Sequence, residues 1–326
     1  MKNYVGIDIA KEQFDVCLLT IEGKQFEAQF ENKKSGINKF HRWLKKHAAP
    51  DAHLALEATG VYGEQLAETM HARAYEVSVI NPARIKAYGN SQMRRTKTDR
   101  LDATLIADYC RTQEPALWSP LAPEIKELRA LVRHFEDLKQ ERQRGRNRLA
   151  TQSVSNLVYK QLQAQIRLLD KQIDEVKKAM KKHIKQYPDL KQDSDLLKSI
   201  PGISDITAAV LLAELGDIRR FDNVREVVAF LGLNPRQHQS GKMNKTRGIS
   251  RMGRKSLRAA LYMPAIVAKQ HNPLLKQWAE GLEKRHLKGK QIIVAVMRKL
   301  IHLAYGIIKS GKAFIPNYGK QMPIAA

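Results

Sequence analysis

The feature that most constrains the fold is a change in hydrophobic pattern near residue 115 of the 326-residue chain. Before that point, short strand-like segments alternate with helix-like ones, whereas after it the apolar residues recur mainly at helical spacing. Strand patterns cover 3–10, 14–20, 24–31, 53–58 and 75–80, and helical patterns cover 36–48, 63–74 and 82–90. Three strands followed by alternating strands and helices predict an α/β domain, a mixed sheet covered by helices.

The region from about 121 to 190 is long, polar and helical in pattern. Its apolar residues are spaced 3, 4, 3 and 4 apart, which predicts a coiled-coil segment: Ile166, Leu169, Ile173, Val176 and Met180. Gly145 and the Thr- and Ser-containing segment 150–156 predict that the first helix is interrupted before the chain turns back. A hairpin that links two domains and a dimerisation arm are both compatible with this pattern.

The last region, 191–326, is predicted to be mainly α-helical. Two apolar helices flank Pro201-Gly202-Ile203, an arrangement typical of a helix-hairpin-helix, whose turn amides can hold a nucleic-acid phosphate. An ordinary helical turn explains the same residues. We therefore expect three domains, at 1–120, 121–190 and 191–326.

The net positive charge of the chain lies almost wholly in its later part. The formal net charge is +24 and the pI is about 10.0. Residues 1–115 hold 17 basic and 15 acidic side chains, so the remainder holds 40 and 18. No acidic residue occurs between Glu226 and Glu280, and 236–258 contains eight Lys or Arg residues. This distribution predicts a polyanionic partner, with nucleic acid favoured over an anionic membrane surface.

The two cysteines, Cys17 and Cys110, lack the spacing of a zinc site, so neither a zinc centre nor a disulfide scaffold is indicated. The chain enters a strand pattern at once, without an apolar signal segment, and the apolar stretches 259–268 and 291–297 are too short to span a bilayer. We expect a cytoplasmic, soluble protein without a membrane partner.

Four carboxylates form the most informative pattern. Asp8 shares one face of its strand with Gly6, and Glu57 ends a later strand in which Ala55 shares its face. Asp99 and Asp102 lie three residues apart on a helix that Thr98 would cap. Acidic residues near a helix N-terminus are also explained by its dipole alone. As a set, these four oxygen donors suit Mg²⁺, with Mn²⁺ as a substitute.

Five segments, taken in their order along the chain, are more specific than the four carboxylates alone. They are GIDIAKEQFDV, LEATGVYGE, INPARIKAYGNSQMRRTKTDRLDA, SIPGISDITAAVLLAELGD, and LGLNPRQHQSG with the following RMGRKSLRAALYMPA. With them the chain closely resembles the Asp-Glu-Asp-Asp insertion-sequence transposases of family one-hundred-ten, bacterial proteins also described as bridge-RNA-guided recombinases. The resemblance covers nearly the whole chain.

The resemblance implies a RuvC-like (RNase H-like) N-terminal domain, a coiled-coil connection and a C-terminal domain with a catalytic serine. The four catalytic, metal-binding acids would be Asp8, Glu57, Asp99 and Asp102, and the serine would be Ser240. It also implies double-stranded target and donor DNA, a structured bridge RNA that acts as guide, and a homo-oligomer, either dimer or tetramer. Activity would then take place at the bacterial nucleoid.

The basic segment 236–258 is predicted to be a loop. In it Ser240 precedes Gly241, so the backbone can approach a phosphate closely. A serine hydroxyl needs an activating group, and His238 is a local candidate base. Ser250 and Ser256 are competing serines, but Ser256 is better explained as a helix N-cap. Predicted nucleic-acid contacts are Arg94, Arg95, Lys97, Arg236, Lys242, Lys245, Arg247, Arg251, Arg254, Lys255 and Arg258.

Three functions remain open on these observations. The first is a DNA recombinase or transposase that exchanges strands through a phosphoserine intermediate. The second is a RuvC-like, Mg²⁺-dependent nuclease or junction resolvase that uses activated water. The third, a noncatalytic nucleic-acid-binding scaffold, would leave the four acids unexplained.

Overall fold

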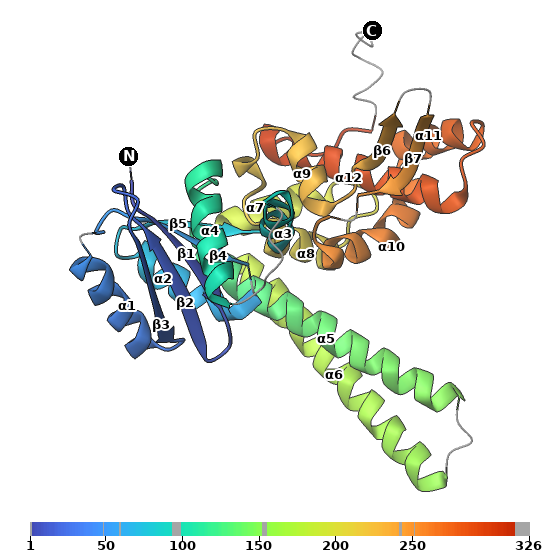
Figure 1. The fold of residues 1–326 in the computed structure, drawn as a ribbon. Helices are drawn as coiled ribbons and strands as arrows, with labels where there is room; N and C mark the ends of the chain where they lie inside the picture. Colours follow the sequence, from blue (N-terminus) through green and yellow to red (C-terminus); the bar gives the residue numbers. More distant parts are fainter. Residues whose placement is uncertain are drawn as a thin grey trace. The chain divides into compact units, whose positions relative to one another are not determined.

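The computed structural model describes residues 2–47, 49–58, 60–92, 99–151, 155–240, 243–250 and 252–316. The chain divides into two compact units, Met1–Pro120 and Leu121–Ala326. Figure 1 shows a strand-rich first unit and a second unit that is mostly helical.

The first unit contains the predicted mixed sheet. Its strands are β1 (Tyr4–Ile9), β2 (Gln13–Leu19), β3 (Gln25–Glu31), β4 (His53–Glu57) and β5 (Glu76–Ile80). The strand order is β3-β2-β1-β4-β5, with antiparallel pairing among β1, β2 and β3 and parallel pairing of β4 with β1 and β5. Every segment predicted as a strand in this region is therefore a strand of one sheet.

Helices cover both faces of this sheet. They are α1 (Lys34–Lys46), the 3₁₀ helix η1 (Gly60–Gly63), α2 (Glu64–His71), α3 (Pro82–Ser91) and α4 (Asp99–Gln113). Val5, Ile7 and Ile9 of β1 join one hydrophobic core with residues of α1 and α2. On the other face, Ala103 and Ala107 of α4 pack with Cys17 of β2. The alternation along β1 thus separates an apolar face from the face that carries Asp8, as predicted.

The second unit begins with a long helical hairpin, α5 (Pro123–Thr151) and α6 (Asn156–Gln186), which is visible in green in Figure 1. The prediction that Gly145 interrupts the first helix is wrong, because α5 continues through it. A Cβ at Gly145 would lie 3.3 Å from Ile166 of α6, so this glycine allows the two helices to approach each other. Leu169, Ile173 and Met180 of the predicted seam are buried.

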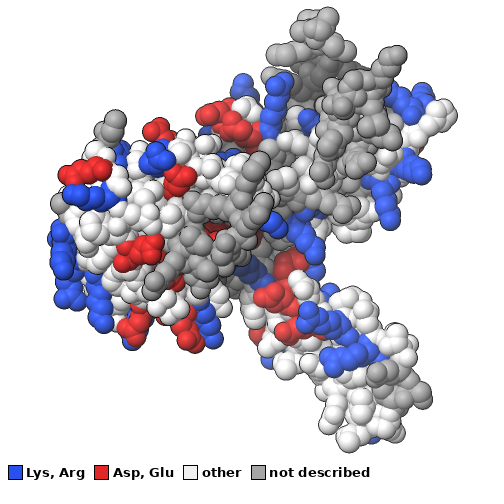
Figure 2. Space-filling view, in the orientation of Figure 1, with Lys and Arg blue, Asp and Glu red and all other residues white. Residues whose placement is uncertain are grey.

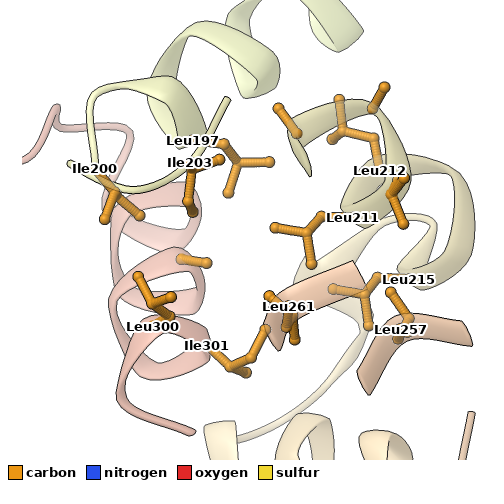
Figure 3. Close-up of a cluster of buried hydrophobic side chains, with 14 of the residues drawn as sticks. Leu197, Ile200, Ile203, Leu211, Leu212, Leu215, Leu257, Leu261, Leu300 and Ile301 are labelled. Atoms are coloured by element: carbon orange, nitrogen blue, oxygen red, sulfur yellow. The ribbon is translucent and has the colours of Figure 1, made fainter. Parts of the chain in front are cut away.

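The rest of the second unit is a helical body. Its elements are α7 (Pro188–Lys198), α8 (Asp205–Leu215), the 3₁₀ helix η2 (Ile218–Arg220), α9 (Val224–Leu231), β6 (Pro235–Ser240), β7 (Met243–Ile249), α10 (Lys255–His271), α11 (Pro273–Glu283) and α12 (Gly289–Ser310). Figure 3 shows the centre of its core, where Leu211 and Leu215 of α8 lie among Leu261 of α10 and Leu300 of α12. Nearly all of α8 is buried.

Two local predictions in this body are wrong. The basic segment predicted as a loop contains the antiparallel pair β6–β7, whose polar residues lack the apolar alternation by which strands are recognised. Ser256 is not an N-cap either, because α10 begins at Lys255 after Arg254, whose backbone is extended.

One helix among the described residues is long and apolar enough to cross a membrane, namely α12, with a mean hydropathy of 1.5 in its most apolar window. The stretch 291–297 alone is too short to span a bilayer, but the helix that contains it continues to Ser310. Nine of its residues are buried in the core, including Val296 and Leu300. This helix therefore fills the centre of the second unit.

Candidate functional site

Two carboxylates lie at the same edge of the sheet, at the carboxyl ends of neighbouring parallel strands. Ile7 of β1 pairs with Leu56 of β4, and Asp8 and Glu57 are the next residue of each strand. Both side chains are half-buried. Because cross-strand neighbours project on the same face, the register brings these two acids side by side.

Helix α4 brings Asp102 to this edge because β1 contains a glycine. A Cβ at Gly6 would lie 2.0 Å from the Ala103 carbonyl oxygen and 2.3 Å from the Ala107 nitrogen. Tyr4, earlier in β1, packs against a cluster that contains Cys110, later in α4. The helix therefore runs opposite to β1, and its N-terminal end, with the half-buried Asp102, lies toward Asp8.

The donor set fits a hard cation in its chemistry, since it consists of carboxylate oxygens. Asp99 is the first residue of α4, but its side chain lies outside the described residues. Among the described side chains, no group of three or more His, Cys, Asp or Glu is close enough to hold a metal ion. The metal site, Asp99 included, therefore stays a prediction.

A fifth carboxylate lies beside this edge and was missed in the sequence. Asp15 of β2 is directly opposite Asp8 and is 6% exposed. The amide nitrogen of Gln29 donates to both of its carboxylate oxygens, at 3.1 and 3.2 Å. Counting back from the short connection between β1 and β2 would have placed Asp15 opposite Asp8, because paired strands keep register across a turn.

The predicted nucleophile, Ser240, is the last residue of β6 and pairs with Met243 of β7. Earlier in the same pair, His238 is opposite Lys245. The side chains of 236–240 and 243–247 lie outside the described residues, as do Gly241, Lys242 and Arg251. The same holds for 93–98, which contains Thr98 and the predicted contacts Arg94, Arg95 and Lys97, and for the Arg100 side chain.

The base of the β6–β7 hairpin is fixed to the helical body. The Ser250 amide donates to the Asn234 carbonyl at 2.8 Å, which closes the two stems. A Cβ at Gly253 would lie 2.5 Å from the Phe230 carbonyl oxygen, so this segment runs directly against the end of α9. Ser240 is therefore carried at the end of a strand whose base is firmly packed.

Two arginines that were predicted to contact nucleic acid bind the protein itself. Arg254 donates from Nη1 to the Glu214 carboxylate at 2.7 Å, and Arg258 donates to the Leu231 carbonyl at 2.7 Å. Glu214 is 4% exposed, and Arg133 of α5 approaches it at 3.9 Å. Lys255 is exposed. Contacts of these basic residues with nucleic acid stay predictions.

Figure 2 shows Lys and Arg side chains interspersed with Asp and Glu over the first unit, in agreement with its nearly balanced charge. The excess of positive charge belongs to the second unit.

Comparison with known proteins covers both units. A family described as "Transposase" matches residues 5–152, and one described as "Transposase IS116/IS110/IS902 family" matches residues 194–280. The pilin gene-inverting protein of Moraxella lacunata is 35% identical over 317 residues, which cover 96% of this chain and 98% of that protein. The chain belongs to the IS110 family of transposases.

Two further transposases are similar to the chain, one over a shorter alignment and one at lower identity. The transposase for insertion sequence element IS1328 of Yersinia enterocolitica is 32% identical over 150 residues, or 45% of this chain and 43% of that protein. The transposase for insertion sequence element IS1111A of Coxiella burnetii is 26% identical over 302 residues, covering 82% and 78%. The predicted family is thus confirmed, and transposition or recombination of DNA is its general activity.

Proposed function

We propose that the chain is an RNA-guided DNA recombinase that inserts and excises a mobile element by exchanging DNA strands through a phosphoserine intermediate. Family membership supports DNA rearrangement, and the similarity to a protein named for gene inversion supports strand exchange. The observation that carries the proposal is the strand register, which aligns Asp8 with Glu57 beside the N-terminal end of α4.

A RuvC-like, RNase H-like identity is proposed for the first unit. The sheet order β3-β2-β1-β4-β5, with three antiparallel strands and two parallel additions, supports it. Asp8 lies on the central strand β1, Glu57 on the neighbouring strand β4 and Asp102 on helix α4, an arrangement that supports this proposal.

Asp8, Glu57, Asp99 and Asp102 would hold Mg²⁺ or Mn²⁺. When bound, such an ion offsets the repulsion between carboxylates and phosphate and stabilises the oxygens of a phosphoryl transfer. Gly6 allows helix α4, which carries Asp102, to pack directly against strand β1. This packing would position Asp102 before DNA binds.

The serine step would be a transesterification. The Ser240 oxygen attacks a DNA phosphorus atom and forms a Ser–phosphate bond. The bond between that phosphorus atom and one sugar oxygen breaks. The serine proton passes to a base, for which His238 is the local candidate, and the departing sugar oxygen gains a proton. A sugar hydroxyl of the second duplex then attacks the same phosphorus atom, a new sugar oxygen–phosphorus bond forms, and the Ser–phosphate bond breaks. The hydroxyl gives up its proton and the serine oxygen regains one. Bond energy is conserved in the intermediate, so strand joining needs no ATP.

The chain would act as a homo-oligomer, either a dimer or a tetramer. Target and donor duplexes would be chosen by a structured bridge RNA from the element. The 40 basic side chains after residue 115 support binding of such polyanions. Reprogramming the RNA should redirect the choice of target.

A matched pair of variants in one helix tests this function. Asp102→Asn should abolish Mg²⁺-dependent strand exchange on a plasmid substrate while leaving RNA and DNA binding in place. Asp108→Asn removes the same charge from α4, but its carboxylate is engaged by Tyr88 at 2.7 Å and Arg111 at 2.6 Å. It should retain exchange. Strand exchange at the wild-type rate by both variants would exclude Asp102 from the reaction.

A further inference from the structure

Five lysines converge on one groove in the second unit, between α6, α7 and α8. The groove contains a cavity of about 60 Å³, lined also by Met180, Ile184 and Ile206. The lysines are Lys177, Lys181, Lys185, Lys191 and Lys198. The cavity is far smaller than the several hundred Å³ of a typical small-molecule site, so an enclosed compact ligand does not fit it.

The lysines follow the helical repeat. Lys177, Lys181 and Lys185 are four residues apart, so they form a row along one face of α6. At a rise of about 1.5 Å per residue the row is about 12 Å long. A nucleic-acid strand rises about 3.4 Å per nucleotide, so the row is long enough to contact more than one phosphate.

Acidic side chains in the groove neutralise only part of this charge. Lys198 lies 2.9 Å from Asp195 and 3.2 Å from Asp205, and Lys181 lies 3.7 Å from Asp205. These are the two carboxylates in the lining, and Lys177 lies 3.0 Å from Asp174 of the same helix. Within the described part of the chain, Lys185 and Lys191 form no ion pair. Both are exposed.

We propose that this lysine groove binds the phosphodiester backbone of a nucleic acid, as a second contact surface apart from the β6–β7 hairpin. An extended anion suits a row of like charges that repel one another and lie over an apolar floor. The proposal rests on the proposed function only in taking the partner to be nucleic acid. Contacts to phosphate carry no base information, so the groove would add affinity without sequence preference.

The groove offers α7 and α8 a way to contact phosphate other than the amides of the turn between them. A Cβ at Gly202 would lie 2.6 Å from the Ala268 Cβ and 2.9 Å from the Pro264 carbonyl oxygen, so one side of the predicted helix-hairpin-helix turn is packed against α10. The lysine groove lies on the face that α7 and α8 share with α6. Phosphate contact through lysine side chains there does not need the turn amides.

Two triple variants with equal charge change test the groove. In the first, Lys177, Lys185 and Lys191 become Gln. In the control, Lys276, Lys284 and Lys290, which are exposed on or beside α11 and α12, become Gln. Affinity of the full chain for a DNA duplex and for a structured RNA is measured over a range of salt concentrations.

The groove variant should bind more weakly than the control and lose up to about 2.7 from the slope of log affinity against log salt, at about 0.9 for each phosphate contact with a duplex. Loss on DNA alone assigns the groove to DNA, and loss on RNA alone assigns it to RNA. Slopes equal to those of the control on both nucleic acids would overturn the proposal. Since only binding is measured, failure of the serine chemistry would not affect this result.

Discussion

Replacing Gly6 by Ala should separate the sheet from α4. The added Cβ would lie 2.0 Å from the Ala103 carbonyl oxygen, whereas ordinary contact begins near 3.4 Å. Backbone atoms therefore have to move apart by about 1.4 Å, because no flexible side chain is available to give way. Overpacking of this kind costs about 1–3 kcal/mol.

The consequence for the candidate site should exceed the loss of stability. Asp102 precedes Ala103, so any displacement of the helix moves this carboxylate away from Asp8. A displacement of about 1 Å in a catalytic group is enough to reduce a rate about 100-fold. The variant should remain folded in dilute buffer but lose nearly all strand exchange.

Urea unfolding followed by tryptophan fluorescence, together with a strand-exchange assay, measures both effects. For a urea dependence of about 1–3 kcal/mol per molar, the midpoint should fall by roughly 1 M. Gly281→Ala in α11 is the control, because nothing lies within 4 Å of its added Cβ and alanine favours a helix. A Gly6→Ala variant with unchanged midpoint and activity would refute the contact between β1 and α4.

Three further predictions follow from buried groups. Arg254→Ala should lower the free energy of unfolding by about 1–3 kcal/mol in urea titrations, because it leaves the buried Glu214 carboxylate with a weaker partner. Burial lowers the pKa of His53, whose Nε2 lies 2.8 Å from Ser78 Oγ, so the folded state favours the neutral ring. Stability should therefore be full above the unfolded pKa of about 6.5 and fall as the pH drops below it, and His53→Gln should flatten this dependence. Burial raises the pKa of Cys110 to about 12, so a thiol reagent at pH 8 should label it only after unfolding.

A control variant or a contradicting result tests each of these predictions. Lys255→Ala, one position from Arg254 and exposed, should leave the urea midpoint unchanged. An unfolding free energy that does not change between pH 7 and pH 5 would contradict the role of His53. Rapid labelling of Cys110 in the native protein would show that its surroundings open readily.

Local pattern was enough to predict the first unit. Alternation along β1 identified the face that carries Asp8, and the helical repeat identified the seam of α6. The β6–β7 hairpin was missed because its strands are polar, so that pairing, rather than burial of alternate residues, defines them. The available signal in the sequence was Gly241, directly after Ser240, because glycine is typical of hairpin turns.

The remainder of the site depends on contacts between distant residues. Nothing local to Gly6 shows that Ala103 lies against it, and nothing local to Arg254 shows that it pairs with Glu214, 40 residues earlier. Likewise, Asp15 becomes part of the carboxylate edge only through its register with Asp8. Residue types indicated the chemistry, whereas tertiary packing decides which side chains are available for it.

Covalent capture of DNA tests the central claim most directly. Wild type, Ser240→Ala and the hairpin control Ser250→Ala are each incubated with Mg²⁺, the structured RNA and labelled DNA duplexes, then denatured and resolved by size. Wild type and Ser250→Ala should carry DNA on the protein, and peptide mapping should place it on Ser240. Ser240→Ala should bind both nucleic acids yet form neither the covalent complex nor exchanged strands. Near-normal strand cleavage by Ser240→Ala would contradict the phosphoserine mechanism and indicate hydrolysis by water instead.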